Sequence, residues 1–195
     1  MIEVEKKFSL TPEQMKRIEE SAEFVKEVIN TDIYFDNPDY ALVKKDWWLR
    51  SRNGNFEIKI PLENKQGLIN IYDEITNTKE VTKRLELKKL SEDFEENLRL
   101  NNFKVLVKLV TNRRKFRIRE FNIDIDQMDC GYTICEIEKM VENENEVEKT
   151  TQEIFELAKS LGLEIKQVRG KGLEYFYRFN KGVYKVIEDT KLRYE

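Results

Sequence analysis

Charged residues stand two positions apart along several segments of this chain, with apolar residues between them. In the segment 2–8, Glu3, Glu5 and Lys7 share one face of an extended strand, while apolar residues occupy most of the other face. The same spacing joins, in chain order, Arg50 and Arg52, Glu57 and Lys59, Arg117 and Arg119, Asp124 and Asp126, and Glu136 and Glu138. A period of two belongs to the β-strand, so the pattern predicts strands with one charged and one apolar face.

The alternating segments follow one another in a hairpin-like succession. They cover residues 2–8, 31–35, 41–52, 55–60, 66–76, 104–118, 121–127 and 132–142. Asn53-Gly54, between two of these segments, is typical of a two-residue hairpin turn. About seven or eight strands joined in this way make an antiparallel sheet large enough to close, so the sequence predicts an α+β fold built on a barrel.

Helical patterns lie between the strands. Thr11, Pro12 and Gln14 form a capping box with proline at the first helical position. This start predicts a helix that runs to about Val28. Further helices are predicted over 79–100 with a break near Ser91, over 146–161 and over 173–179. The chain has no linker rich in Pro, Gly or Ser and no internal repeat, so we expect one domain over residues 1–195.

Composition excludes several kinds of chemistry. The chain has no histidine, which rules out a Ser-His-Asp triad, a Cys-His pair and imidazole metal ligands. Its two cysteines, Cys130 and Cys135, are too few for a disulfide framework or a structural zinc site. The balance of 35 Lys and Arg against 38 Asp and Glu argues against a protein that binds nucleic acid by bulk charge.

The cellular setting follows from what the sequence lacks. No apolar run approaches the length of a membrane span, and acidic residues rather than a signal peptide follow Met1. We therefore expect a reduced, cytoplasmic, soluble protein, and nothing in the sequence demands more than a monomer. Any catalysis by such a chain must use carboxylates, amines, guanidiniums or a metal ion.

The charged faces have two interpretations. A half-solvated antiparallel sheet produces the same alternation. Here, however, several strands are segregated by sign, with acids on three of them and arginines on another. If the apolar faces turn outward against the helices, a closed barrel holds its charges inside, where they must pair or bind ions. Clustered carboxylates bind Mg²⁺ or Mn²⁺, and clustered Arg and Lys bind phosphate oxygens, so one ligand that satisfies both sets is a metal–polyphosphate.

A series of motifs resembles the CYTH, or triphosphate tunnel metalloenzyme, superfamily. In chain order they are the ExExK signature Glu3–Lys7, Tyr34–Pro38, Trp48–Arg52 as W-L-R-x-R, Glu57–Lys59, Arg113 three residues before Phe116, Asp124–Asp126, Gly131-Tyr132, Glu136–Glu138 and Lys171. The resemblance spans Glu3 to about Phe179. Within the superfamily the chain is most similar to the animal-type thiamine-triphosphatases, through Asp46–Arg50 and the turn Asp129–Tyr132.

The resemblance implies a closed eight-stranded antiparallel β-barrel, a triphosphate tunnel with surrounding helices. It assigns one or two Mg²⁺ or Mn²⁺ ions to Glu3, Glu5, Asp124, Glu136 and Glu138. It assigns the triphosphate to Lys7, Arg50, Arg52, Lys59, Arg113 and Lys171, and stacks the thiamine on Trp48. Glu5, Glu136 and Lys59 are the groups expected to act on the reacting phosphate. An aromatic face at the tunnel mouth suits a cationic thiazolium.

Several of these residue assignments have an alternative. Arg114 competes with Arg113, and Lys166 or Arg169 competes with Lys171, because both stretches are locally basic. Asp126 is expected to support the following turn rather than to bind metal. Glu74 is a candidate inner-wall acid within the poorly matching segment 62–79. Packing alone also accounts for Trp48, and it is the simplest interpretation of the aromatic run at 175–179.

The expected reaction is hydrolysis of the terminal phosphate of thiamine triphosphate to thiamine diphosphate and orthophosphate. The same tunnel would serve an inorganic tripolyphosphatase, a nucleoside-triphosphatase or an adenylate cyclase of the class IV type. Outside the enzymes, a polyphosphate-binding module is the main rival, and a structural protein with a charged sheet is a third class. The expected partner is a small triphosphate, with no nucleic acid and no membrane.

Overall fold

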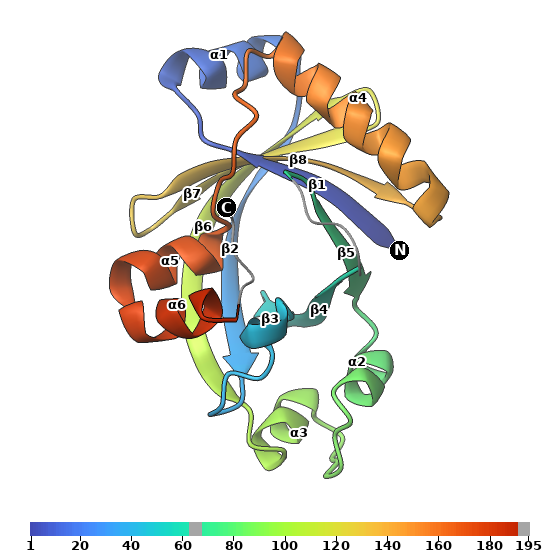
Figure 1. Ribbon diagram of the computed structural model, residues 1–195, viewed down its shortest axis with the longest axis vertical. Helices are drawn as coiled ribbons and strands as arrows, with labels where there is room; N and C mark the ends of the chain where they lie inside the picture. The colour runs from blue at the N-terminus through green and yellow to red at the C-terminus, as the bar shows by residue number, and fades with distance from the viewer. Residues whose placement is uncertain (63–67, 191–195) are drawn as a thin grey trace.

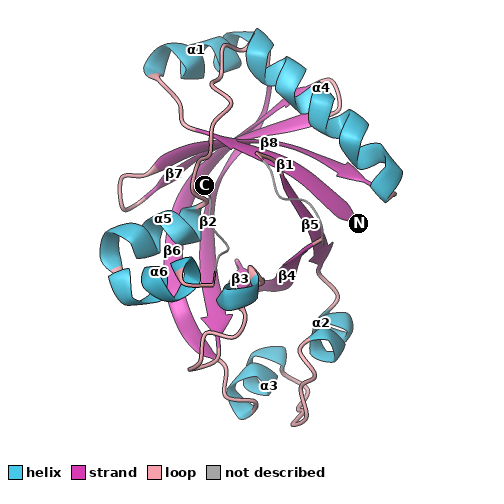
Figure 2. Ribbon diagram, viewed as in Figure 1, coloured by secondary structure: helices cyan, strands magenta, loops and turns pink. Residues whose placement is uncertain are grey.

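Eight strands close into one antiparallel barrel in the computed structural model, which describes residues 1–62 and 68–190 (Figures 1 and 2). The order around the barrel is β1-β5-β4-β3-β2-β6-β7-β8. The strands are β1 Ile2–Phe8, β2 Glu23–Asp36, β3 Trp48–Arg52, β4 Asn55–Pro61, β5 Asn70–Ile75, β6 Lys104–Ile118, β7 Phe121–Met128 and β8 Thr133–Val141. This topology confirms the predicted closed, eight-stranded antiparallel barrel.

The period-two pattern separates the two faces of the barrel wall. On β1, Glu3, Glu5 and Lys7 line an internal cavity, and Val4 and Phe8 on the opposite face are fully buried under helices. The wall is therefore apolar outside, where helices cover it, and charged inside. This arrangement follows from strand geometry, because successive side chains point to opposite faces of a sheet.

Two pairs of helices cover the outer face. The helices α1 (Pro12–Ser21) and α4 (Val147–Ser160) lie over β1 and β8, where Ile18 and Ile154 join the same buried cluster as Val4. The helices α2 (Thr78–Arg84) and α3 (Phe94–Leu100) pack on the other side, through Val81 and Leu98. Two short 3₁₀ segments, Val43–Lys45 and Glu144–Glu146, complete the connections.

A third pair of helices packs on inward-facing residues. In α5 (Lys171–Phe179) and α6 (Lys181–Glu188), Phe176 and Val183 share a cluster with Leu109 of β6 and Met128 of β7. Leu109 lies on the same strand face as Arg113, and Met128 on the same face as Asp126. The first turn of α5 lines the internal cavity through Lys171. The start of α5 therefore forms part of the cavity wall, although it lies far along the chain from β1.

The first helix is shorter than predicted. It ends at Ser21 instead of continuing to about Val28, and residues 23–28 belong to β2. This half of β2 pairs with β6, and the ring of Phe24 packs against that of Phe116 with centroids 5.5 Å apart. Val25 and Val28 also favour a strand over a helix. Pairing with a distant strand overrides the local helical pattern.

The strand predicted over 41–52 begins only at Trp48. The Asp36 carboxylate accepts hydrogen bonds from the backbone N–H groups of Leu42 and Val43, each at 3.0 Å, and so organises a turn. A 3₁₀ segment follows, and Asp46 then adopts a left-handed conformation with φ of 57°. A side chain that satisfies backbone donors locally competes with the strand ladder.

Other boundaries differ by smaller amounts. The break in 79–100 extends from Leu85 to Asp93, and Asp93 rather than Ser91 caps the second helix by accepting from the Glu95 N–H at 3.0 Å. The helix α6 (Lys181–Glu188) is not predicted from the sequence, although the Asn180 side chain caps its start. The strand predicted from residue 66 begins at Asn70, and residues 66 and 67 lie outside the described ranges. The Asn53-Gly54 turn is confirmed, with both φ angles positive.

Two further observations bear on the predictions from composition. Cys130 and Cys135 are both free thiols. Over the described ranges, none of the helices combines the length and the apolar character that a membrane span requires.

Candidate functional site

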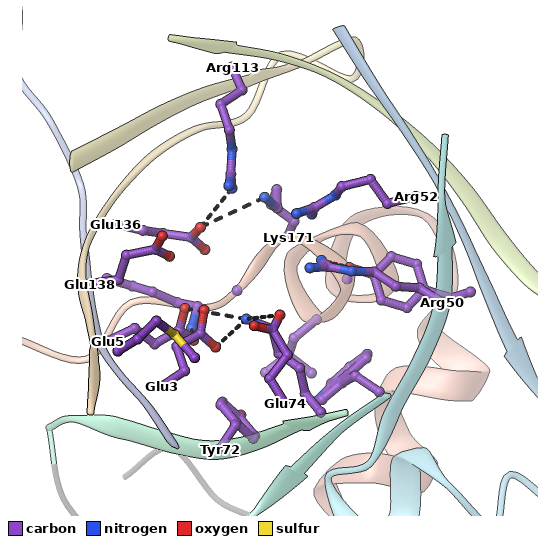
Figure 3. A pocket seen from close by; sticks show the side chains of 18 of the residues that line it. Glu3, Glu5, Arg50, Arg52, Tyr72, Glu74, Arg113, Glu136, Glu138 and Lys171 are labelled. Atoms are coloured by element: carbon purple, nitrogen blue, oxygen red, sulfur yellow. Dashed lines mark hydrogen bonds and ion pairs between the residues drawn. The ribbon is translucent and has the colours of Figure 1, made fainter. Parts of the chain in front are cut away.

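The inner faces of the strands surround a cavity of about 300 Å³, at the lower end of the usual size range for small-molecule sites (Figure 3). All predicted site residues except Asp124 line it. They are Glu3, Glu5, Lys7, Trp48, Arg50, Arg52, Lys59, Arg113, Glu136, Glu138 and Lys171. The structure therefore brings together, from five strands and one helix, residues that the sequence spreads over 169 positions of a 195-residue chain.

Three carboxylates converge on one side of the cavity. The antiparallel register of β1 and β8 places Glu5 directly opposite Glu138, and Glu3 lies two residues before Glu5 on the same face. One oxygen from each of the three side chains lies within 4.8 Å of the others. Like charges placed opposite each other destabilise a sheet, so this arrangement needs a compensating cation. We call Glu3, Glu5 and Glu138 the acid trio.

The acid trio fits a divalent cation. Burial raises the pKa of Glu3 to about 7, with Glu5 and Glu138 adding to the effect and Lys59 opposing it. Burial also raises the pKa of the Glu138 carboxyl, helped by the charge of Asp124. Both shifts report negative charge crowded into a buried space. Carboxylate oxygens alone form the donor set, which is the set that Mg²⁺ and Mn²⁺ prefer.

Two lysines ion-pair with the acid trio. The Lys59 ammonium contacts Glu3 and lies 3.9 Å from Glu5 and 4.0 Å from Glu74, and Lys7 contacts Glu5. Burial disfavours the charge on Lys59, but Glu3 and Glu5 outweigh burial and raise its pKa. Glu5 likewise raises the pKa of Lys7 against the effect of burial, so both lysines stay protonated at neutral pH beside the acids.

Two arginines of β3 face the acid trio across the cavity (Figure 3). The Arg52 guanidinium donates to both oxygens of Asp32, at 2.7 and 3.0 Å. Arg50 donates to Glu57 at 2.7 Å and to the Tyr34 hydroxyl at 3.2 Å. Burial opposes ionisation of Asp32, but the hydrogen bonds and charges of the two arginines lower its pKa to about 2. These acids fix the guanidinium planes, which suits two-pronged recognition of phosphate oxygens.

A second cationic cluster joins Arg113 to Lys171. Arg113 donates to both oxygens of Asp126 at 2.6 Å and to Glu136 at 2.9 Å, and Lys171 contacts Asp126. The prediction that Asp126 supports the following turn is wrong. The register of β6 and β7 places Asp126 opposite Arg113, and the turn closes through the Gly131 N–H, which donates to the Met128 carbonyl.

Asp124 is the predicted site residue that does not line the cavity. It is fully buried, contacts Arg113 and lies 3.3 Å from the Lys115 ammonium. Over the described ranges, neither of its oxygens accepts a hydrogen bond. Its role as a metal ligand stays a prediction, and so does that of Glu136, which lies between Arg113 and Lys171.

The alternative basic residues point away from the cavity. Arg114 contacts Glu19 of α1 on the outer surface, one residue from the inward-facing Arg113. Lys166 pairs with Glu164 at 2.7 Å in an exposed position. Arg169 stacks on the Tyr177 ring at 4.0 Å. Geometry therefore favours Arg113 and Lys171 as the cavity residues.

The part of the cavity next to Trp48 is aromatic. Trp48 meets the Tyr34 ring edge-on, with centroids 5.9 Å apart, and its indole N–H donates to Asp46 at 2.6 Å. The start of α5 packs closely here, because a Cβ atom at Gly172 would lie 3.0 Å from the Trp48 ring. Trp48 therefore both packs and lines the cavity, so neither interpretation made from the sequence excludes the other.

Several cavity residues escaped the sequence analysis. Tyr34, Tyr72, Lys115, Met140 and Leu173 all line the cavity, and Glu74, the candidate inner-wall acid, lines it too. Asp32 lies behind Arg52 as its partner. The period of two could have identified two of these residues. Asp32 lies two residues before Tyr34, and Lys115 lies two residues after Arg113, so each shares a strand face with a residue that lines the cavity.

Comparison with known proteins identifies the architecture. The CYTH domain model matches residues 1–169. The thiamine-triphosphatase of Homo sapiens is 27% identical over 202 aligned positions, covering 92% of this chain and 86% of the relative. A solved structure from Pyrococcus horikoshii OT3 superposes with a TM-score of 0.70 at 24% identity, covering 90% of this chain and 98% of that one. A Hippeastrum protein named as an adenylyl cyclase, with a dominant triphosphatase activity, superposes with a TM-score of 0.58 at 16% identity, covering 91% and 95%.

Proposed function

Because the chain belongs to the CYTH family, we propose that it is a metal-dependent hydrolase that converts thiamine triphosphate into thiamine diphosphate and orthophosphate. The observation that carries the proposal is the convergence of the acid trio and two cationic clusters on one internal cavity. A protein that only binds phosphate gains nothing from three carboxylates that converge within 4.8 Å of one another unless a metal ion intervenes. The name of the human relative supports thiamine triphosphate as the substrate.

The cationic side chains bind the triphosphate. They come from three sides of the cavity and comprise Lys7, Arg50, Arg52, Lys59, Arg113 and Lys171. Hydrogen bonds between ionised partners are about twice as strong as neutral ones, and arginine adds a planar, two-pronged geometry. Phosphoryl transfer depends mainly on positioning and on charge stabilisation, so a set of this kind accounts for most of the required chemistry.

The acid trio would hold Mg²⁺ or Mn²⁺, and Asp124 and Glu136 stay further predicted ligands for the one or two ions. When bound, the ion neutralises phosphate oxygens and lowers the pKa of a coordinated water, which supplies a nucleophile in a chain without histidine. Lys59 contacts Glu3 of the acid trio and also lines the cavity, so we assign it to the charge that develops on the reacting phosphate. Glu136 orients Arg113 and Lys171, and Glu5 orients Lys7.

The test measures orthophosphate release in Mg²⁺ from thiamine triphosphate, inorganic tripolyphosphate and ATP at equal concentration, with EDTA as the control. Arg113→Gln and Arg114→Gln form a matched pair, since one arginine points into the cavity and its neighbour points outward. We expect Arg113→Gln to lower kcat/KM about 100-fold, the effect of losing charge-assisted contacts of about 3 kcal/mol. Arg114→Gln should stay within about twofold of the wild type.

Each other outcome points to a different function. Preference for tripolyphosphate would still support the charged cavity as the active site, but it would leave Trp48 with a packing role only. Pyrophosphate release from ATP without orthophosphate would indicate a cyclase. Metal-dependent binding of tripolyphosphate without any turnover would indicate a polyphosphate-binding module, and equal activity in both arginine variants would contradict the site itself.

A further inference from the structure

A half-buried carboxylate lies behind the aromatic wall of the cavity. Asp46 accepts a hydrogen bond from the Trp48 indole N–H at 2.6 Å through one oxygen, and from the Tyr72 hydroxyl at 3.0 Å through the other. Trp48 and Tyr72 both line the cavity. They come from β3 and β5, which are separated by β4 in the barrel. One carboxylate therefore joins two ring side chains from strands that are not neighbours.

Asp46 occupies a position that glycine or asparagine could also fill. Its backbone is left-handed, with φ of 57°, a conformation that glycine, asparagine and aspartate adopt more readily than other residues. Burial raises the pKa of the Asp46 carboxyl, and the hydrogen bonds from Trp48 and Tyr72 oppose that rise. A turn alone does not require a charge at this position, because glycine or asparagine would close it as well. The carboxylate must therefore be explained by what it contacts.

The hydrogen bonds change the character of the wall. An indole N–H or a phenol O–H that donates to a carboxylate leaves its ring richer in electrons, and the faces of such rings attract cations. The half-buried charge of Asp46 adds to the same negative potential. The Lys59 ammonium already lies 5.9 Å from the centre of the Tyr72 ring. This wall suits an organic cation and disfavours the anionic end of a phosphate chain.

We propose that Asp46 is a positioning residue that determines which class of triphosphate the tunnel accepts. It holds Trp48 and Tyr72 in place and gives their wall the negative potential that receives a cationic aromatic ring carrying a triphosphate. This inference rests on the proposed function and extends it. Selectivity for an organic cation then depends on Asp46, Trp48 and Tyr72 together rather than on Trp48 alone. The cationic clusters that hold the phosphates are not part of that set of three residues.

The test compares Asp46→Asn with Asp39→Asn, an exposed aspartate near the same turn. Both changes are made in a Trp47→Phe background, so that Trp48 is the one tryptophan left of the two in the sequence. The first readout is the ratio of kcat/KM for thiamine triphosphate to kcat/KM for tripolyphosphate. The second is quenching of Trp48 fluorescence by thiamine diphosphate, which requires no turnover.

We expect Asp46→Asn to lower the ratio on the order of tenfold through a higher KM for thiamine triphosphate, the size of one lost cation–π contact. Trp48→Phe, which keeps a ring but loses the N–H donor, should lower it similarly, and the double variant should add little. Asp39→Asn should leave the ratio unchanged. An equal fall for both substrates would reduce Asp46 to a structural role, and an unchanged ratio would overturn the inference while leaving the proposed function intact.

The fluorescence readout separates the two proposals. If the wild type fails to hydrolyse thiamine triphosphate, the proposed function falls. Quenching of Trp48 by thiamine diphosphate that is weakened on the order of tenfold in Asp46→Asn would still support the role of Asp46 in binding. Equal quenching in the two proteins, or none in the wild type, would overturn it.

Discussion

Replacing Glu138 by Gln should stabilise the metal-free protein, whereas replacing Glu5 by Gln should destabilise it. The two residues face each other across β1 and β8 and belong to the same acid trio, but their partners differ. Glu5 contacts Lys7 and lies 3.9 Å from the Lys59 ammonium. Glu138 forms no ion pair with the described residues, and Asn122 donates to it only at the weak distance of 3.5 Å.

The expected magnitudes follow from these partners. Glu5→Gln leaves the buried Lys7 without its carboxylate, and breaking a buried pair from one side costs about 3–5 kcal/mol. The Asn70 side chain, 3.2 Å from the Lys7 ammonium, keeps the cost near the lower end. Glu138→Gln removes repulsion from Glu5 and Glu3 but also loses attraction to more distant cations, so we expect a gain of about 1 kcal/mol. For a domain of this size, 1 kcal/mol corresponds to about 2–4 °C in Tm.

Thermal unfolding in EDTA and in Mg²⁺ measures both effects. In EDTA, Tm should fall by about 6–12 °C for Glu5→Gln and rise by about 2–4 °C for Glu138→Gln. Added Mg²⁺ at about 100 times its Kd should stabilise the wild type by about 2.7 kcal/mol and neither variant to that extent. If Glu138→Gln lowers Tm in EDTA as much as Glu5→Gln does, the reasoning from unpaired charge is wrong.

The remaining predictions concern the cationic clusters and the aromatic wall. The pKa of Asp32 is about 2 in the folded protein against 3.8 for the free group. Its ionisation therefore contributes about 2.5 kcal/mol to the free energy of unfolding; this contribution is present above pH 4 and is lost as pH falls towards 2. Urea unfolding of Asp32→Asn should show this loss at pH 7 and a shrinking difference from the wild type below pH 4. Lys171→Gln should lower turnover far more than the matched exposed variant Lys166→Gln, because only Lys171 reaches the cavity; equal effects in a phosphate-release assay would refute this. Gly172→Ala should press on the Trp48 ring and raise KM for thiamine triphosphate more than for tripolyphosphate; an unchanged KM ratio would mean that the ring moves freely.

The barrel and its charged inner face could be predicted because strand alternation is a local property. The order of Glu3, Glu5 and Lys7 on one face requires only that residues 2–8 form a strand, and the structure places them there. Once the apolar faces turn outward under helices, closure of the barrel brings the charged faces together. No long-range information is needed for that step.

The ends of the helices and strands, and the residues that face each other on neighbouring strands, could not be predicted in the same way. Residues 23–28 fit a helix or a strand locally, and pairing with β6 decides between them. Sequence alternation shows that Asp126 shares a face with Asp124, but it does not show which residue stands opposite. In the register of β6 and β7 that residue is Arg113. Asp126 therefore binds Arg113 in a cationic cluster instead of supporting the turn.

The cavity has a charged part and an aromatic part, and only the charged part follows from a regular sequence pattern. This difference explains why the substrate is harder to predict than the fold. The charged part comes from strand residues at a fixed spacing, and its chemistry suits any metal-bound triphosphate. The aromatic part joins Trp48, Tyr72 and the first turn of α5, which meet through a turn at Asp46 and a glycine contact. No periodic pattern links these residues. Because the proposed phosphate-binding residues would act on every triphosphate alike, discrimination between thiamine triphosphate and tripolyphosphate would have to come from the aromatic part. Substitutions in the charged part therefore test whether the protein is a triphosphatase, and only substitutions around Asp46 and Trp48 test which triphosphate it takes.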